Sequence, residues 1–265
     1  MCGIAGYSLS CASSVNRTLA AQALLAGIAE RGADAVGYAF RGQENEISVH
    51  KRRSGATALL DELHVPAEAT HALVHVRDYT KGHPRIEANN HPIRHGAVVG
   101  IHNGIIVNDE QIFARYGFRR AQPDMTVDSE AIFALAEHAE GRPEALEELH
   151  GAMATGWLDE RVPSTLFLAR AVGRPLWIGT AGHELFFAST REALEVLERT
   201  IRVGLRKREV DEGMLLRVEE SRIESVERFV PDRSYVEETI LPTVRAPNEG
   251  RSSLQRLAAI ALAAV

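Results

Sequence analysis

The stretch that decides the fold runs from His75 to Asn108 and reads HVRDYTKGHPRIEANNHPIRHGAVVGIHNGIIVN. Apolar runs at Ala72–Val76 and Ala97–His102 predict a strand at each end of this stretch. The first strand delivers Arg77 to a loop, and the second is expected to end in His102-Asn103-Gly104. Asn-Gly after a strand ordinarily signals a turn, but the Asn amide and the Gly backbone N–H are also two donors that can hold one developing negative charge.

The N-terminus carries a second signal, because Cys2 is followed by Gly3 and an apolar strand. Methionine before a small residue is removed during synthesis, which would make Cys2 the N-terminal residue. A free α-amino group has an ordinary pKa of about 7.7–8.0, so it can accept the thiol proton near neutral pH. A cysteine at position two is by itself an ordinary residue, and the prediction of a nucleophile depends on the other motifs.

Further apolar runs predict strands and helices along the chain. Strands are expected at Ile4–Leu9, Val36–Phe40, Ile47–His50, Thr165–Ala169, Leu176–Gly179, Leu185–Ala188 and Gly213–Val218. Helices are expected at Arg17–Glu30 with Asn16 as N-cap, at Val127–Glu140, and from Pro143 to about His150. Because the strands cluster instead of alternating strictly with helices, the pattern favours stacked antiparallel sheets with helices outside.

The C-terminal part differs in composition from the rest. We expect one domain over residues 1–220 and an extension over residues 221–265. Within the extension, Pro242–Gly250 (PTVRAPNEG) is expected to form a loop or hinge. A last apolar helix is expected at Ser252–Val265, and its apolar face has to pack on the body of the protein or on a partner.

Composition indicates a globular protein with a sizeable core, since the 265 residues are 45% hydrophobic and 25% charged. The formal net charge of −6 and the lack of a dominating Lys/Arg block disfavour nucleic-acid binding. The longest apolar stretch, Leu257–Val265, is too short to span a bilayer, so no membrane role is expected. No signal peptide pattern is visible and Cys2 and Cys11 need no disulfide, so we expect a cytoplasmic, reduced protein.

Six histidines between His71 and His102 raise the alternative of a metal site. Their spacing is irregular, no acidic helix pairs with them, and neither HExxH nor CxxC occurs. We therefore expect neither a metal nor an organic cofactor.

The segments MCGIAGY, RGADAVGYAF, HVRxxTxG, NxHPI and HNGII, in this order, together resemble the class II glutamine amidotransferases. The resemblance runs from Met1 to about Val218. It implies the N-terminal-nucleophile hydrolase fold, an α+β four-layer αββα sandwich of two antiparallel sheets between helical layers. It also implies an enzyme that hydrolyses L-glutamine to glutamate and ammonia without a cofactor.

The resemblance assigns a role to each motif by position. It implies that Cys2 attacks the glutamine amide and forms a glutamyl thioester, while Asn103 and Gly104 hold the oxyanion. It implies that Arg77 pairs with the substrate α-carboxylate and that Asp128 binds the α-ammonium. The other implied site residues are Thr80, which contacts the substrate, Asn90 and His91, which flank the pocket, and Arg31, which supports the nucleophile.

Part of this logic follows from the residues themselves. A free amino acid is a zwitterion, and its capture needs a cation and an anion, which Arg77 and Asp128 offer. Asp128 also stands at an expected helix start, where an acidic residue is favoured by capping and the helix dipole, and we expect both roles to coexist. Asp78 stands where one branch of the family has an aromatic residue that gates the ammonia path. The sequence therefore does not predict how this loop closes over the glutamine pocket or how ammonia leaves it.

Two other classes of protein stay open beside this interpretation. One is an N-terminal-cysteine hydrolase that acts on another amide, and the other is a non-catalytic subunit that binds glutamine. Nothing in the sequence names the ammonia acceptor. We expect a separate synthase partner, docked near the apolar stretch Leu254–Val265, with a longer parent protein as the alternative. A homo-oligomer is also compatible with the sequence.

Overall fold

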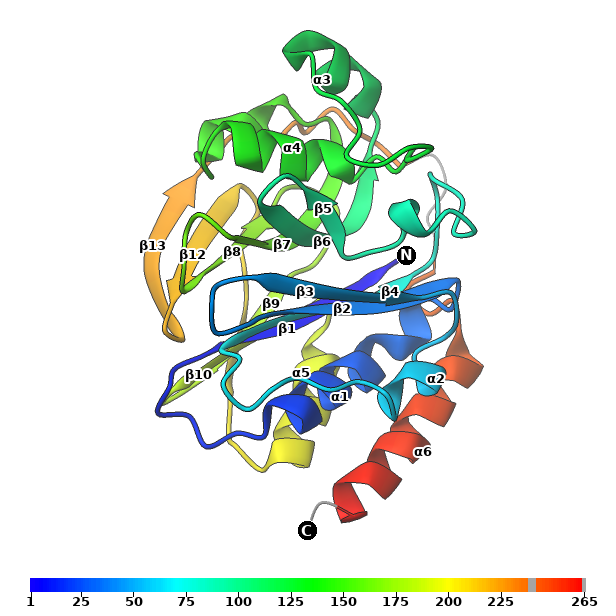
Figure 1. Ribbon diagram of the computed structural model, residues 1–265, viewed down its shortest axis with the longest axis vertical. Coiled ribbons are helices and arrows are strands. Elements are labelled where there is room, and N and C mark those ends of the chain that lie inside the picture. The colour runs from blue at the N-terminus through cyan, green and yellow to red at the C-terminus, as the bar shows by residue number, and fades with distance from the viewer. Residues whose placement is uncertain (238–241, 264–265) are drawn as a thin grey trace.

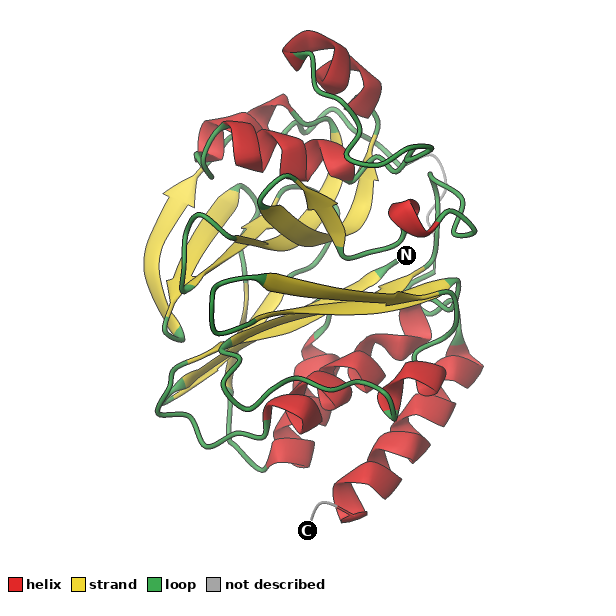
Figure 2. Ribbon diagram, viewed as in Figure 1, coloured by secondary structure: helices red, strands yellow, loops and turns green. Residues whose placement is uncertain are grey.

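The computed structural model describes residues 1–237 and 242–263. The chain forms four layers, in which a seven-stranded sheet and a six-stranded sheet face one another and helices cover both outer faces (Figures 1 and 2). Neighbouring strands in both sheets pair antiparallel. The structure therefore confirms the α+β αββα sandwich expected from the sequence.

The first sheet has the strand order β11-β9-β10-β1-β4-β2-β3. Its strands are β1 (Gly3–Leu9), β2 (Ala35–Arg41), β3 (Ile47–Arg52), β4 (His71–Arg77), β9 (Trp177–Ala181), β10 (Glu184–Ala188) and β11 (Arg206–Glu209). β1 lies at the centre between β4 and β10 and is buried at every position, because layers cover both of its faces. Cys2 therefore directly precedes a buried central strand, which fixes its position.

The second sheet has the order β13-β12-β8-β7-β6-β5. Its strands are β5 (Ile93–His95), β6 (Val98–Ile106), β7 (Gly151–Asp159), β8 (Thr165–Arg170), β12 (Met214–Glu219) and β13 (Arg222–Arg228). The expected strand end after His102 is wrong, because β6 continues through Asn103 and Gly104. Gly104 has φ +149°, and a Cβ there would lie 1.8 Å from the Ala152 carbonyl oxygen, so the strand needs glycine at this point.

Helices cover the outer faces of both sheets (Figure 1). On the first sheet these are α1 (Arg17–Ile28), α2 (Thr57–Leu60), α5 (Arg191–Ile201) and α6 (Pro247–Ala263), and on the second α3 (Asp109–Tyr116) and α4 (Glu130–His138). The 3₁₀ turns are η1 (Ala29–Arg31), η2 (Glu87–Asn89) and η3 (Pro143–Glu148). Asn16 caps α1 as predicted, since its Oδ1 accepts the Leu19 N–H at 3.0 Å.

The C-terminal extension differs from expectation. β13 pairs with β12, so the second sheet extends to Arg228 and the boundary expected after residue 220 falls within this hairpin. α6 begins at Pro247, inside the stretch expected to be a loop, because proline suits the first turn of a helix. Leu257 of α6 is buried against the core of the protein itself, and residues 264–265 of the expected helix lie outside the described residues. None of the described helices is long and apolar enough to cross a membrane.

Candidate active site

A cavity of about 180 Å³ lies beside the start of β1. Figure 1 shows the N-terminus entering the molecule at the level where the two sheets face one another. The cavity wall brings together four of the predicted site residues, Cys2, Thr80, Asn103 and Gly104. These residues come from three separate parts of the chain, so the fold assembles them. The other lining residues are Met1, Asp78, Ile105, Arg174, Tyr235 and Glu237.

The Cys2 thiol lies in this wall and donates to the carbonyl oxygen of Asp78, with Sγ 3.4 Å from that oxygen. Arg31 donates from Nε to the carbonyl oxygen of Cys2 at 2.8 Å, so it holds the backbone of the predicted nucleophile. Burial raises the pKa of the Cys2 thiol, while the positive charge of Arg77 acts in the opposite direction. A buried thiol needs a neighbouring base to become a nucleophile, and a free α-amino group on Cys2 is such a base.

Asn103 is buried, and neither its Oδ1 nor its Nδ2 has a hydrogen-bond partner within the described parts of the chain. Most buried amides in proteins are paired, because an unpaired one loses its hydration without compensation. This amide lies in the cavity wall beside Gly104. A ligand oxygen in the cavity would satisfy the Nδ2 donor, which is the arrangement of an oxyanion site.

Arg77 is buried and is not in the cavity wall. Its Nη1 donates to Asn90 Oδ1, and its Nη2 donates to the carbonyl oxygens of Lys81, at 2.8 Å, and Gly82. Asn90 in turn donates from Nδ2 to the Pro84 carbonyl oxygen at 2.9 Å. The guanidinium therefore organises the loop that follows β4, and its contact with a substrate carboxylate stays a prediction.

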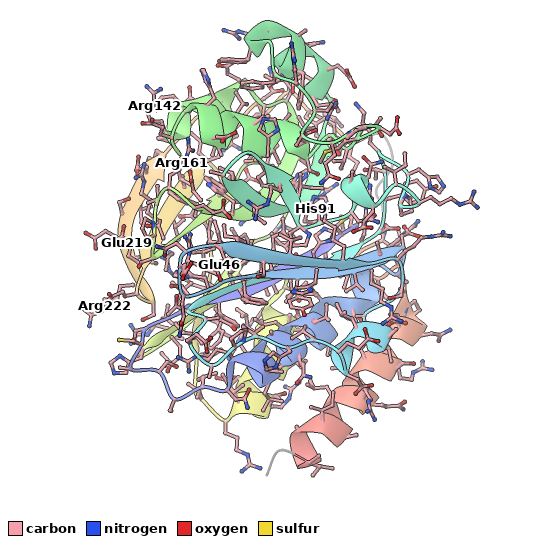
Figure 3. All side chains as sticks on the ribbon, in the orientation of Figure 1. Glu46, His91, Arg142, Arg161, Glu219 and Arg222 are labelled. Carbon is pink, nitrogen blue, oxygen red and sulfur yellow. The ribbon has the colours of Figure 1, made fainter. Side chains whose placement is uncertain are left out.

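Asp128 and His91 are also buried outside the cavity wall. Asp128 Oδ2 accepts the Ile106 backbone N–H at 2.7 Å and so braces the end of β6. Burial raises the pKa of Asp128 to about 6. His91, labelled in Figure 3, stacks on His75 with ring centroids 4.2 Å apart, and burial lowers its pKa well below the ordinary value.

Sequence reasoning gave no role to the cavity residues Asp78, Arg174 and Glu237. Asp78 forms ion pairs with the Met1 α-ammonium and, at 3.1 Å, with Nε of Arg245. Arg174 makes a two-point ion pair with Glu237, with Nη2–Oε1 at 2.6 Å and Nη1–Oε2 at 3.1 Å. Asp78 was detectable because it follows Arg77 directly, whereas the other pair joins distant segments that no motif connects.

Three of the other histidines have polar side-chain partners of their own. His71 contacts Ser8 Oγ at 3.2 Å, His95 contacts Glu130 at 2.9 Å, and His102 contacts Ser129 Oγ at 2.9 Å. Within residues 1–237 and 242–263, no three His, Cys, Asp or Glu side chains gather in a way that could hold a metal ion.

Two antiparallel sheets between helical layers form the fold of the N-terminal-nucleophile hydrolases. In this chain a cysteine directly before the central strand and a buried amide that is unpaired within the described residues line the same cavity. Residues 81–196 match the family model described as "Glutamine amidotransferase domain". The glutamine–fructose-6-phosphate aminotransferases (isomerizing) of Shigella flexneri and Escherichia coli K12 are 32% identical over 207 residues, 73% of this chain and 32% of those proteins. The chain thus spans about a third of the length of these curated relatives.

Solved structures agree on the fold. The glutamine phosphoribosylpyrophosphate amidotransferase of B. subtilis matches 85% of this chain and 49% of its own, with a TM-score of 0.65 and 20% identity. Together these similarities support a class II glutamine amidotransferase domain in this chain.

Proposed function

We propose that this chain, once Met1 has been removed, hydrolyses L-glutamine to L-glutamate and ammonia with Cys2 as the nucleophile. One observation carries the proposal. The unpaired amide of Asn103 lies in the wall of the same cavity as the Cys2 thiol, next to Gly104. Hydrolysis of an amide requires a nucleophile and a donor set for the oxyanion in one place, and this cavity supplies both.

The reaction takes two steps. The α-amino group of Cys2 accepts the thiol proton, and Sγ adds to the side-chain carbonyl carbon of glutamine, whose oxyanion accepts hydrogen bonds from Asn103 Nδ2 and the Gly104 N–H. The C–N bond then breaks as the α-ammonium returns the proton to the leaving nitrogen, which departs as ammonia. In the second step water adds to the thioester carbonyl, the C–S bond breaks, and glutamate leaves with Cys2 restored.

Recognition of the amino-acid end is assigned to residues beside the cavity. Thr80 already lies in its wall. Arg77 would reach the α-carboxylate by exchanging its bonds to Lys81 and Gly82 for bonds to the ligand, and Asp128 would face the α-ammonium. Asn90 and His91 shape this side of the pocket. Asn90 accepts a hydrogen bond from Arg77, and His91 stacks on His75 of β4, the strand that ends in Arg77.

Trapping the thioester tests the chemistry directly. Protein with processed Cys2 is mixed with L-glutamine, quenched in acid and digested at acid pH, and the masses of its peptides are measured. The expected result is a glutamyl adduct on the peptide that contains Cys2, which is absent from Cys2→Ala. L-Asparagine and N-acylated amines in place of glutamine separate this proposal from a hydrolase of other amides, and adducts with those compounds alone would refute it. Bound glutamine with no adduct and no glutamate release would indicate a binding subunit instead.

We also propose that a separate synthase protein receives the ammonia and docks near α6. Leu254 and Leu262 of this helix are 43% and 80% exposed, although Leu257 packs inward. A candidate acceptor protein is tested by cross-linking to the wild type and to Leu254→Ser/Leu262→Ser. Equal cross-linking of both would refute the docking site and would leave the hydrolysis proposal unaffected.

A further inference from the structure

Arg174 places a fixed positive charge in the wall of the catalytic cavity. It lies in the connection between β8 and β9, its side chain is 6% exposed, and Nη1 donates to the Gly173 carbonyl oxygen at 2.8 Å. Burial is the main cause that lowers the pKa of Arg31, which holds Cys2, and of His102, which precedes Asn103, and the positive charge of Arg174 adds to it. Arg174 therefore lies near the neighbours of both Cys2 and Asn103, in the wall that these two residues share.

The carboxylate that Arg174 holds belongs to the segment after the last strand, residues 229–237, which we name the strap. The strap is anchored at its start, where Phe229 is buried and the Val230 N–H donates to Glu147 Oε1 at 2.8 Å. Its other end brings Tyr235 and Glu237 into the cavity wall. The Glu237 side chain is 26% exposed, so it is the member of the pair that can exchange with a ligand.

The chemistry of this contact corresponds to the proposed product. The Glu237 side chain ends in the same CH₂–COO⁻ group that hydrolysis of glutamine creates on glutamate. Arg174 binds this group through two parallel donors, which is the geometry that selects a carboxylate over a neutral amide. The third guanidinium nitrogen, Nε, is buried, and its N–H has no acceptor in the described residues.

We propose that Arg174 is a further binding residue of the active site, which holds the carboxylate formed at the reacting carbon of glutamate. Glu237 occupies this place in the resting protein as a tethered copy of the product, and it has to leave before glutamate can bind there. The inference rests on the proposed function, because the carboxylate is the one that glutamine hydrolysis produces. It leaves the α-carboxylate to Arg77.

Protection of Cys2 against iodoacetamide by L-glutamate tests this inference without requiring turnover. Alkylation of Cys2 is read from its peptide mass, and the exposed Cys11 in the same chain is the internal reference. With Glu237→Gln, Cys2 should react faster while Cys11 reacts at the wild-type rate. Half-protection of Cys2 should need about fivefold less glutamate, because the tethered competitor is weakened. With Arg174→Gln, half-protection should need at least about tenfold more glutamate, and Arg174→Lys should lie between, because it keeps the charge and loses the fork.

Glu227→Gln is the matched control, since Glu227 also pairs with an arginine, Arg217 at 2.9 Å, but does not line the cavity. It should behave as the wild type. The inference is overturned if Arg174→Gln is protected at the wild-type glutamate concentration, or if Glu237→Gln behaves as Glu227→Gln does. If the variants show these shifts but the wild type releases no glutamate from glutamine, the proposed function is refuted and Arg174 stays a carboxylate-binding residue.

Discussion

Asn103 is the side chain that we propose as oxyanion donor, and its buried amide is unpaired in the described structure. Replacing it by alanine removes the proposed oxyanion donor, so we expect kcat for glutamine hydrolysis to fall by about 10²–10³-fold. No protein hydrogen bond within the described residues is lost, so the urea midpoint should stay at the wild-type value or rise slightly.

Asn89 supplies the matched control for this substitution. It is an equally buried asparagine whose Oδ1 accepts the N–H groups of Thr126, at 2.7 Å, and Val127, at 3.0 Å. Asn89→Ala should lower the free energy of unfolding by about 1–3 kcal/mol, because the buried Val127 N–H and the partly buried Thr126 N–H lose their acceptor. An Asn103→Ala variant that is destabilised as much as Asn89→Ala would assign Asn103 a structural role.

Asp128 gives the protein a defined pH dependence. Its pKa is raised to about 6 in the fold, whereas an unfolded aspartate titrates near 3.9. Between these values the folded state binds more protons, so the contribution of Asp128 to stability is largest below pH 4 and is lost as the pH rises through 6. The free energy of unfolding of the wild type relative to Asp128→Asn should fall by up to about 3 kcal/mol over this range. Urea titrations at several pH values measure it, and a difference that stays flat or grows with pH contradicts the assignment.

At the scale of single residues, continuous motifs in the sequence were enough to select residues that lie in or beside one cavity, and the roles of these residues stay predictions. Contacts between segments that no motif connects could not be predicted. Cys2, Thr80, Asn103 and Gly104 line one cavity, and Arg31 reaches the Cys2 carbonyl. Two-point pairing of Arg174 with Glu237 depends on the path of the strap to the cavity wall, which no local pattern encodes. The loop conformation in which Arg77 donates to Lys81 and Gly82 was not predictable either, because many carbonyl and carboxylate oxygens could accept from an arginine.

Among the elements, α6 tests how far the C-terminal extension belongs to the fold. Leu257 is 4% exposed and packs with the core that includes α1. Leu257→Ala should lower the free energy of unfolding by about 2–5 kcal/mol. Leu254→Ala, at a half-exposed position of the same helix, should change it by no more than about 0.5 kcal/mol. Urea unfolding of both variants measures the contrast, and equal midpoints would show that α6 adds nothing to the stability of the body.

The strands rich in Val, Ile and Phe were predictable, and β7 was not. Its sequence GAMATGWLD has small residues and no regular alternation, yet all of its positions are buried. A central strand covered on both faces selects small side chains where layers approach closely, and these look like a loop in the sequence. α5 was not predicted, although its start carries a recognisable signal, since Thr190 is the N-cap and its Oγ1 accepts the Ala193 N–H at 3.2 Å.

Across the whole molecule, the two sheets act as one frame. Cys2 directly precedes β1 of the first sheet, and β6 of the second sheet carries Asn103 and Gly104, so the proposed nucleophile and the proposed oxyanion donors meet only when both sheets pack. Ile4, Leu73 and Ile101 belong to the apolar cluster between the sheets. The proposed site therefore depends on the complete fold, and the proposed mechanism also requires a free Cys2 amine.

The most direct measurement is glutamate release from L-glutamine by the purified protein, with the N-terminal mass determined in the same sample. Three preparations are compared, namely processed protein that begins at Cys2, processed Cys2→Ala, and protein that retains an N-terminal extension. We expect release from the first alone, because the second lacks the thiol and the third lacks the free α-amino base. Release from Cys2→Ala at the wild-type rate, or from the extended protein, would contradict catalysis by an N-terminal cysteine.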